Sequence, residues 1–507
     1  MPLRSCRNIL TKNLILMFLA ITAGAVITLS FAPIDQWYFG ILGCLLLLII
    51  LDKIPTNYSF WIGWLFGIGL FGFGTSWISV SIDLYGGASS LLAWTLTLIF
   101  CVSLGIFYAI FSYAYKRWLH DTLLGSTLGF SALWVVFEWL RSWIFSGFPW
   151  LYLGYSHLET PLSGYAPIGS VFAVSFLCAL SAGLLFAIIL NPQKHIKIIA
   201  VCFLLLIWIS GLMLKNITWT SPARQNPIDI AIYQPNIPQE KKWEWEYRTY
   251  IKEKIANRIS QLLDHDLIVL PEAAIPDYFS NSANLLTQIT REAEKLDSAL
   301  LLGIPTLSSD GQNSYNSVMI LGAGDGIYHK RRLVPFGEYV PFENQLRGLI
   351  EFFDLPMSNF AQGKQDQSLL NAQDILIAPF ICYEIAYADL VLREAKKADV
   401  IVTLSNDSWF GDSMGPHQHL QIARMRALET GRFVIRATNN GISAIINPKG
   451  IVTTTAPQFK EAVMTGKVYS MQGNTPASTA GLPITIGGCW IFLLSLGLRI
   501  YLASRRG

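Results

Sequence analysis

The chain reads Ala378-Pro379-Phe380-Ile381-Cys382-Tyr383-Glu384 at the end of an apolar run that begins at Asp374. A short apolar run of this kind predicts a buried strand. In α/β folds, ligands and catalytic groups gather at the carboxyl ends of strands. Cys382 is the only cysteine between Lys215 and Ala480, so it has no disulfide partner in its own region. It is therefore either an inert buried thiol, which is common for a lone cysteine, or a nucleophile.

Outward from this stretch, the composition is that of a membrane protein. The 507 residues are 52% hydrophobic and only 14% charged, whereas soluble domains carry about 25% charged residues. The net charge of +3 is too small to indicate a nucleic-acid partner, and no basic cluster interleaved with aromatic residues appears. Charged residues are few before Lys215 and many between Lys215 and Lys467. This contrast predicts a transmembrane bundle of seven helices at residues 1–214, a folded domain at 215–480, and an eighth helix with a cytoplasmic tail at 481–507.

Eight apolar segments approach the roughly 20 residues that a helix needs to cross a bilayer. Basic residues precede the first segment, fill alternate connections and follow the last segment. The positive-inside rule assigns such positions to the cytoplasm, so both termini are expected there and residues 215–480 on the outer side. The first segment also resembles a signal peptide, but the apolar segments that follow at once favour a retained helix. The expected spans are Asn13–Phe31, Trp37–Leu51, Ser59–Ile78, Ser89–Tyr115, Thr122–Leu140, Ile168–Leu190, Ile196–Leu214 and Leu482–Leu502.

The connection from Arg141 to Pro167 is rich in aromatic residues and broken by glycine and proline. Such a segment suits the membrane interface, where Trp and Tyr concentrate. Glu138 and Arg141 precede it three residues apart, so they can pair on one helical face. Ionisable groups at this depth are expensive and usually functional; the alternative is a simple interface anchor.

The region between Lys215 and Ala480 alternates strands and helices, which predicts a layered α/β core. Two of its strands, Ser317–Gly322 and Ile327–His329, form an expected hairpin. The other expected strands are Ile228–Tyr233, Leu267–Leu270, Ala299–Ile304, Ile375–Ile381, Val400–Ser405, Phe433–Ala437 and Ser443–Ile446. The expected helices are Tyr247–Leu263, Asn284–Leu296 and His417–Thr430.

Three expected strand ends in this region carry reactive side chains. Glu272 follows Leu267–Leu270, Lys330 stands where the hairpin gives way to a loop, and Cys382 ends a third strand. A thiol becomes a nucleophile beside a base or a positive charge. Glu272 has the chemistry to accept its proton, and Lys330 has the charge to stabilise a thiolate or an oxyanion. Each signal alone is weak, because strand-end carboxylates and lysines in basic runs are often solvated surface groups.

A set of short motifs in the chain carries a family resemblance. These are Gln234-Pro235-Asn236-Ile237-Pro238-Gln239, Leu270-Pro271-Glu272, Lys330–Pro341, Cys382-Tyr383-Glu384, Ser405–Gly411, Pro416–His419, Arg424–Ala427, Glu138–Arg141 and Gly147–Trp150. Over most of Pro227–Val468 the chain resembles the nitrilase, or carbon–nitrogen hydrolase, superfamily, which has a Glu-Lys-Cys triad on separate strand ends of an α-β-β-α sandwich. The closer resemblance is to the membrane branch of that superfamily, the apolipoprotein N-acyltransferases, and it covers nearly the whole chain.

The resemblance implies a two-step acyl transfer on the periplasmic face of the bacterial inner membrane. Cys382 attacks the sn-1 ester of a phospholipid, typically phosphatidylethanolamine. The resulting thioester then passes its acyl chain to the α-amino group of a diacylglyceryl-cysteine at the N-terminus of an apolipoprotein. Glu272 is the implied general base, and Lys330 is implied to stabilise the oxyanions together with a backbone N–H near Tyr383.

The resemblance also implies supporting residues. Glu338 is a second carboxylate that orients the lysine or the incoming group. Tyr383, Glu384 and Trp243 resemble supporting positions of the family's site, and Trp245 competes with Trp243 for its role. No cofactor is implied.

Two further features of the sequence bear on function. His417 and His419 are two residues apart, so they diverge on a helix, and no cysteine or paired carboxylates complete a tetrahedral metal set. A structural or helix-start role is expected for them. Large apolar residues suit a lid or a membrane-dipping loop, with ordinary packing as the alternative. They are Phe352, Phe353, Leu355, Met357 and Phe360.

Two other functions stay open from the residues. A membrane-anchored amidase or nitrilase would use the same triad on a small amide and would need neither a lipid-facing loop nor eight spans. A multi-pass transporter or receptor with an outer binding domain would carry charged residues along a path through the spans, which are nearly charge-free apart from Glu138. The chain is expected to be a monomer.

Overall fold

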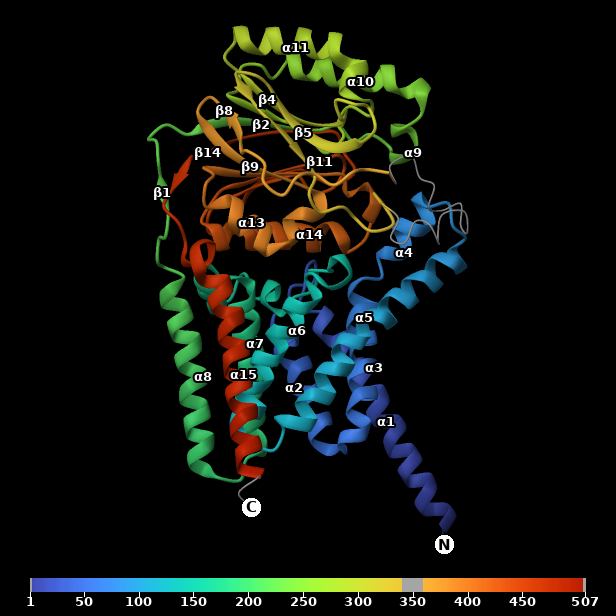
Figure 1. The fold of residues 1–507 in the computed structure, drawn as a ribbon, viewed down its shortest axis with the longest axis vertical. Coiled ribbons are helices and arrows are strands. Elements are labelled where there is room, and N and C mark those ends of the chain that lie inside the picture. The colour runs from blue at the N-terminus through green and yellow to red at the C-terminus, as the bar shows by residue number, and fades with distance from the viewer. Residues whose placement is uncertain (1, 340–358, 505–507) are drawn as a thin grey trace. The chain divides into compact units, whose positions relative to one another are not determined.

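The computed structural model describes residues 2–339 and 359–504, and the chain divides into two compact units (Figure 1). The helical unit comprises Met1–Ser79, Ser90–Ile217 and Ala480–Gly507. The sheet unit comprises Thr218–Thr479 together with Val80–Ser89. The sheet unit therefore includes the connection between the third and fourth expected spans.

Apolar helices make up most of the helical unit, because a helix satisfies its backbone hydrogen bonds internally. A helix lies at each of the eight expected positions. The α-helices are α1 (Pro2–Thr28), α2 (Tyr38–Lys53), α3 (Thr56–Gly74), α4 (Ile78–Val80), α5 (Ser90–Trp118), α6 (Phe130–Arg141), α7 (Ala166–Leu190), α8 (Lys194–Leu214) and α15 (Leu482–Ser504). Shorter π and 3-10 turns are η1 (Ser81–Tyr85), η2 (Gly125–Gly129), η3 (Ile144–Ser146), η4 (Leu153–His157), η5 (Pro161–Tyr165) and η10 (Ala477–Gly481).

The expected count of eight spans is not confirmed by the length and composition of these helices. Within the described residues, four helical stretches are long and apolar enough to cross a membrane, and a fifth follows if α3 and the bent segment Ile78–Tyr85 form one span. The helices α2 and α6 have only 16 and 12 residues, which is short of the roughly 20 that a span needs. The four stretches are Ser90–Trp118, Pro161–Leu190, Lys194–Leu214 and Ala477–Arg499.

Glu138 and Arg141, on α6, bind the backbone of the aromatic segment that follows them instead of pairing with each other as expected. Arg141 Nη1 donates to the carbonyl oxygens of Phe148 at 2.9 Å and Trp150 at 2.5 Å. Leu153 N donates to Glu138 Oε1 at 2.9 Å. Because both side chains are buried, these bonds satisfy backbone groups that would otherwise be costly to bury. Glu138 and Arg141 together therefore anchor the aromatic segment that follows α6.

Strands and short helices alternate in the sheet unit, as expected. Its strands are β1 (Ser221–Pro222), β2 (Ile228–Gln234), β3 (Leu267–Val269), β4 (Ala299–Leu307), β5 (Ser314–Gly322), β6 (Gly324–Asp325), β7 (Ile327–His329), β8 (Leu370–Ala372), β9 (Ile375–Ile381), β10 (Val400–Ser405), β11 (Val434–Thr438), β12 (Ala444–Ile446), β13 (Val452–Thr455), β14 (Ala462–Val468) and β15 (Met471–Gln472). Its helices are α9 (Gln239–Lys242), α10 (Trp245–Ser260), η6 (Phe279–Ser282), α11 (Ala283–Lys295), η8 (Cys382–Ala386), α13 (Ala388–Ala395), η9 (Asp407–Phe410) and α14 (Gly415–Thr430).

Apart from β1 and β15, which pair with each other, the described strands form two large sheets that pack face to face. One has the order β14-β2-β3-β4-β5-β7 and the other β13-β12-β11-β10-β9-β8-β6. At the centre of each sheet three strands run parallel, β2-β3-β4 in the first and β9-β10-β11 in the second. Their carboxyl ends are therefore the places where side chains from several strands can meet.

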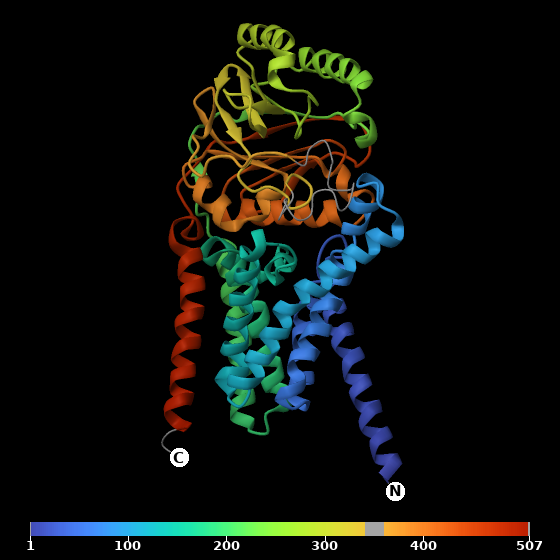
Figure 2. The ribbon, with the colours of Figure 1, turned by 45° about the vertical axis from the view of Figure 1, so that its right-hand side comes forward.

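The alternation of side chains along β2 explains the layers. Ile230 and Ile232 lie in the core between the two sheets, whereas Ala231 and Tyr233 pack with residues of α10 and α11, because successive side chains of a strand point to opposite faces. The helices α13 and α14 cover the outer face of the second sheet (Figures 1 and 2). The four layers confirm the expected α-β-β-α sandwich.

The expected hairpin is confirmed, since β5 and β7 pair antiparallel. Its turn has an additional role, because Gly324–Asp325 pairs with β8 of the other sheet. The strands β13 and β14 were not expected. Both are half-exposed. Threonines fill most of β13, and Thr465, Gly466 and Lys467 interrupt the apolar residues of β14, so both strands lack the continuous apolar signal of a buried strand.

Candidate active site

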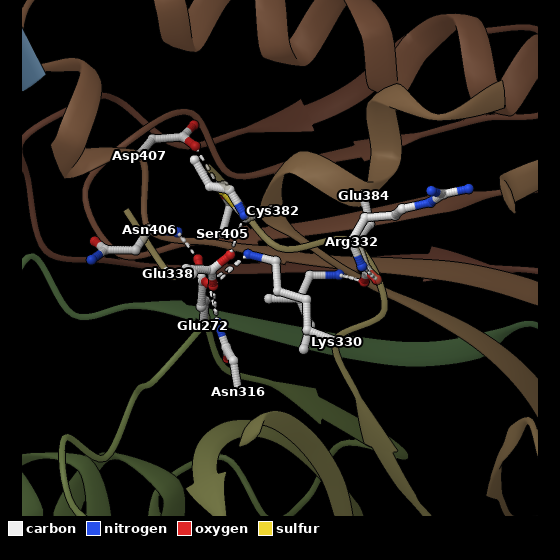
Figure 3. Close-up of polar contacts among 12 residues, drawn as sticks. Glu272, Asn316, Lys330, Arg332, Glu338, Cys382, Glu384, Ser405, Asn406 and Asp407 are labelled. Atoms are coloured by element: carbon white, nitrogen blue, oxygen red, sulfur yellow. Dashed lines mark hydrogen bonds and ion pairs between the residues drawn. The ribbon is translucent and has the colours of Figure 1, made fainter. Parts of the chain in front are cut away.

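Three strand ends bring the predicted triad together at one edge of the sandwich (Figure 3). Glu272 follows β3 by three residues, Lys330 directly follows β7, and Cys382 directly follows β9. The first two strands belong to one sheet and the third to the other. The site therefore depends on the packing of the two sheets as well as on each strand.

Lys330 lies between two carboxylates. Its Nζ is 2.8 Å from Glu338 Oε1 and 3.5 Å from Glu272 Oε1. All three side chains are buried. Burial disfavours the ammonium charge, but Glu338 and Glu272 outweigh it and raise the pKa of Lys330 above its usual value. Lys330 is therefore a fixed cation at neutral pH.

Asn316, on β5, joins the same two carboxylates and was not predicted. Its Nδ2 donates to Glu272 Oε1 at 2.7 Å and to Glu338 Oε1 at 2.9 Å. The other oxygen of Glu272 accepts from the backbone N–H of Asn406 at 2.9 Å. The hydrogen bonds from Asn316 and Asn406 fix the orientation of the Glu272 carboxylate. The sequence gives no sign of this role, because Asn316 lies within a polar part of its strand that resembles an exposed edge.

Cys382 stands at a strained turn from β9 into η8. Its φ is +53°, a left-handed conformation that costs a non-glycine residue about 1–3 kcal/mol and is concentrated at functional sites. Burial and the Glu272 carboxylate raise the pKa of the thiol to about 12, while Lys330 opposes them. The resting thiol is therefore protonated at neutral pH, and a base must remove its proton.

Glu384 connects the lysine loop to the cysteine turn. Its carboxylate accepts from Arg331 N at 2.6 Å and Arg332 N at 3.1 Å, and from Ile381 N at 2.8 Å. The hydroxyl of Tyr328 donates to both of its oxygens, at 2.8 and 2.9 Å. Burial raises the pKa of Glu384, and these bonds oppose that effect. Glu384 thus holds the segments on which Lys330 and Cys382 stand.

Trp243 and Tyr383 are next in the chain to residues of the site, Lys242 and Cys382. Trp243 is half-buried and follows Lys242, whose buried Nζ donates to the backbone oxygen of Glu272 at 3.1 Å. Among the described residues, Trp243 Nε1 has no hydrogen-bond partner. Trp245 is 76% exposed and lies against the Arg248 guanidinium. Of the two tryptophans, Trp243 is therefore the one joined to the Glu272 segment.

Tyr383 is half-buried, and its ring lies edge-on to Tyr387 with 5.3 Å between the centroids. Of the expected lid residues, those at 352–357 lie outside the described residues. Phe360 is described and is half-buried, and its N–H donates to the backbone oxygen of Glu338 at 3.0 Å. The backbone of Phe360 is thus bonded to the backbone of Glu338, the residue whose carboxylate pairs with Lys330.

The two histidines of α14 differ in their surroundings. His417 is half-buried in the first turn, and His419 is fully buried, with Nε2 at 3.1 Å from the carbonyl oxygen of Cys382. His419 thus contacts the backbone of Cys382, and its expected structural role stays a prediction. Across residues 2–339 and 359–504, no group of three or more His, Cys, Asp or Glu side chains is arranged to hold a metal ion.

A protonated thiol, an aimed carboxylate and a fixed cation at one sheet edge are the parts of nucleophilic acyl transfer. The carboxylate accepts the thiol proton, the sulfur attacks a carbonyl carbon, and the cation stabilises the oxyanion. When the tetrahedral intermediate then expels its leaving group, which takes the proton from the carboxylate, the product is a thioester. The acceptor that then takes the acyl group decides whether such a site is a hydrolase or a transferase.

Comparison with known proteins gives two family models. The model described as apolipoprotein N-acyltransferase N-terminal domain matches residues 23–184, and the carbon-nitrogen hydrolase model matches residues 229–474. The apolipoprotein N-acyltransferase of Azotobacter vinelandii is 44% identical over 472 residues, with 90% of each chain covered. That of Coxiella burnetii is 38% identical over 485 residues, with 94% of this chain and 98% of the relative covered.

A solved structure with a similar fold is Nit3 of Saccharomyces cerevisiae, a member of branch 10 of the nitrilase superfamily. The match covers 49% of this chain and 93% of Nit3, with 18% sequence identity and a TM-score of 0.38.

Proposed function

The chain belongs to the family of apolipoprotein N-acyltransferases, and on that premise we propose a two-step acyl transfer through a thioester on Cys382. The donor is a phospholipid, with phosphatidylethanolamine as the expected one, and the acceptor is a diacylglyceryl apolipoprotein. The observation that carries the proposal is the meeting of Glu272, Lys330 and Cys382 at three strand ends, with Lys330 ion-paired to the base.

In the first step the enzyme becomes acylated. Glu272 takes the proton of the Cys382 thiol while the sulfur attacks the sn-1 ester carbonyl of the phospholipid. Lys330 and a backbone N–H near Tyr383 stabilise the tetrahedral oxyanion. The C–O bond then breaks, the leaving oxygen takes the proton from Glu272, and a lysophospholipid departs.

In the second step the acceptor is acylated. The α-amino group of the diacylglyceryl-cysteine attacks the thioester carbonyl, and Glu272 takes a proton from the nitrogen. Lys330 stabilises the second oxyanion in the same position. The C–S bond breaks, the sulfur recovers the proton, and the triacylated lipoprotein leaves with an amide in place of its amine.

Glu338 serves as the second carboxylate that orients Lys330. Its Oε1 accepts from Lys330 Nζ, and its Oε2 accepts from Val334 N at 2.8 Å. A cation held by two carboxylates cannot drift toward either the sulfur or the lipid phosphate. Tyr383, Glu384 and Trp243 support the site, Glu384 by fixing the backbone and Trp243 by walling the entrance.

We place this site on the periplasmic side of a bacterial inner membrane. Eight spans with both termini in the cytoplasm leave the catalytic domain, residues 215–480, on the outer side. In chain order this domain follows the bundle of residues 1–214 and precedes the final helix of residues 481–507. Basic residues in alternate connections support this orientation. The protein works as a monomer, since one chain contains all the residues that the mechanism uses.

Mass spectrometry of the purified full chain tests the proposal. After incubation with phosphatidylethanolamine and no acceptor, the Cys382 peptide gains a fatty-acyl mass, and a diacylglyceryl peptide with a free amine removes it. In Cys382→Ala neither change occurs. Cys202→Ala, which replaces an exposed cysteine elsewhere in the chain, is the matched control and behaves as wild type. An unmodified Cys382 with intact lipid would refute the proposal, and hydrolysis of small amides would then favour an amidase.

A further inference from the structure

A buried cluster of polar side chains lies beneath Cys382, and the proposed mechanism does not use it. Ser405, Asp407, His419 and Arg436 are each at most 1% exposed. They come from the end of β10, from η9, from α14 and from β11. A charged group is not buried this deeply without a specific set of partners, so the contacts of the cluster indicate what it holds.

Asp407 is the centre of the cluster. It accepts hydrogen bonds from Ser405 Oγ at 2.5 Å and from Arg436 Nη2, and its Oδ1 is 3.1 Å from His419 Nδ1. Burial alone disfavours the carboxylate, but Arg436 and His419 outweigh it, and the pKa of Asp407 falls below its usual value. Asp407 is therefore ionised and keeps Arg436 in place.

The far side of His419 faces the nucleophile. His419 Nε2 is 3.1 Å from the backbone oxygen of Cys382. A carbonyl oxygen can only accept, so Nε2 carries the hydrogen and donates it. Burial and the Arg436 cation lower the pKa of His419, with Asp407 opposing. On the other edge of the ring, Nδ1 lies 3.1 Å from Asp407 Oδ1 and 3.2 Å from Arg436 Nη2, so these two groups fix the orientation of the ring.

The backbone of Cys382 needs such support. With a φ of +53°, the residue occupies a conformation that persists only when its surroundings hold it. On one side, the preceding N–H of Ile381 is held by Glu384. On the other side, the carbonyl of Cys382 is held by His419. These two bonds bracket the strained residue and fix the direction in which its sulfur points.

We propose that His419 is a positioning residue for the nucleophile: its Nε2–H holds the carbonyl of Cys382 and thereby aims the sulfur, while Asp407 and Arg436 fix the ring. The inference rests on the proposed function, because it assumes that Cys382 attacks the lipid. Asp407 also directly follows Asn406, whose N–H holds Glu272. One dipeptide, Asn406-Asp407, therefore sets the positions of both the base and the nucleophile.

The test compares two side chains of nearly equal length at residue 419. His419→Gln keeps an N–H donor, and His419→Met has none. His417→Met, in the same helix and half-buried, is the matched control. The measurements are the first-order rate of Cys382 acylation by phosphatidylethanolamine, the KM for that lipid, the rate of Cys382 alkylation by iodoacetamide, and the Tm in detergent.

We expect His419→Met to acylate about 10²-fold more slowly than wild type with an unchanged KM, because a misplaced reacting group costs about that much. His419→Gln retains a rate within about threefold of wild type, and His417→Met is unaffected. Equal rates for the Gln and Met variants would overturn the inference. So would losses that follow the Tm alone.

Two further controls keep the outcomes distinct. If His419→Met does not fold, Asp407→Asn provides the second route. It frees the ring while leaving Nε2–H in place, and it should slow acylation by about tenfold without raising KM. A wild-type rate would overturn the inference.

If wild-type Cys382 is alkylated by iodoacetamide but never acylated by lipid, the proposed function fails. If lipid acylates all variants equally, only the role of His419 fails.

Discussion

Cys382 has a neighbour, Glu272, that hinders its ionisation and also serves its chemistry. Burial and Glu272 raise the pKa of the thiol to about 12. A raised pKa favours the protonated form, so below pH 12 the thiolate fraction increases about tenfold with each pH unit. At neutral pH almost no free thiolate exists. In the proposed mechanism, reaction with lipid then depends on proton transfer to Glu272 as the sulfur attacks.

Glu272→Gln is therefore expected to have opposite effects on two reactions of Cys382. In wild type, iodoacetamide alkylation increases about tenfold per unit from pH 7 to 10 without a plateau. The variant is alkylated faster at each pH, because it loses the charge that raised the pKa. Its acylation by phosphatidylethanolamine falls about 10²-fold or more, since a general base contributes about that much.

Peptide mass spectrometry of Cys382 follows both reactions in the same sample. Glu253→Gln, at an exposed position of α10, is the control and leaves both rates unchanged. Slower alkylation in Glu272→Gln, or a wild-type plateau below pH 9, would contradict this account of the thiol.

The single residues of the candidate site could be predicted from the sequence where they belong to a recognisable motif. Glu272, Lys330 and Cys382 were predicted because each stands at an expected strand end and carries a reactive group, and because the family resemblance joins the three into a triad. Asn316 and the contacts of Asp407 were not, since they depend on which side chains meet when two sheets pack. His419 was expected to be structural, but its contact with the backbone oxygen of Cys382 could not be predicted from the spacing of residues in the sequence.

Among the elements of the chain, the loop after β7 and the turn after β9 act as one piece because of Glu384. Four donor groups point at its two oxygens: the hydroxyl of Tyr328 and the N–H groups of Ile381, Arg331 and Arg332. An acceptor of this kind cannot be replaced by an amide without turning an NH₂ group toward another donor.

Glu384→Gln is expected to loosen this connection. A buried donor left without a partner costs about 1–3 kcal/mol, so we expect the Tm to fall by several degrees and the acylation rate of Cys382 to fall about tenfold. Asp389→Asn is the matched control, because Asp389 is 58% exposed and 3.6 Å from Arg332, and such a surface pair contributes about 0–1 kcal/mol. Similar Tm values for the two variants, measured by thermal unfolding in detergent, would count against the role of Glu384.

The strands and helices were predictable to the extent that burial makes a continuous signal. The bounds of β9 and β10 agree with the apolar runs Ile375–Ile381 and Val400–Ser405. The expected span Thr122–Leu140 is divided into η2 and α6. This division could not be predicted, because the hydropathy of a segment does not depend on the type of helix that it forms. The half-exposed strands β13 and β14 were not predicted, because both are edge strands and lack a continuous apolar run. Edge strands avoid such runs, since an exposed apolar edge would pair with other chains.

In the whole molecule, Val80–Ser89 ties a distant part of the chain to the site. The hydroxyl of Ser81 donates to the backbone oxygen of Trp409 at 2.6 Å, and the ring of Tyr85 lies edge-on to Trp409 with 5.4 Å between the centroids. Trp409 belongs to η9, the turn that follows Asn406 and so follows the N–H that holds Glu272. No local pattern predicts a contact between segments more than 300 residues apart.

The path of the chain through the membrane gives the last prediction. If the chain crosses eight times, both termini lie on the same side of the membrane. The basic residues Lys194 and Lys197 in one connection and Arg505 and Arg506 at the end indicate that this side is the cytoplasm. Fusions of green fluorescent protein after Pro192 and after Gly507 should then fluoresce. Alkaline phosphatase, which needs disulfides that form only outside the cytoplasm, should be active only when fused after Arg224. Phosphatase activity at Gly507 would require an odd number of spans, and activity after both Arg224 and Pro192 would mean that no span separates these two positions.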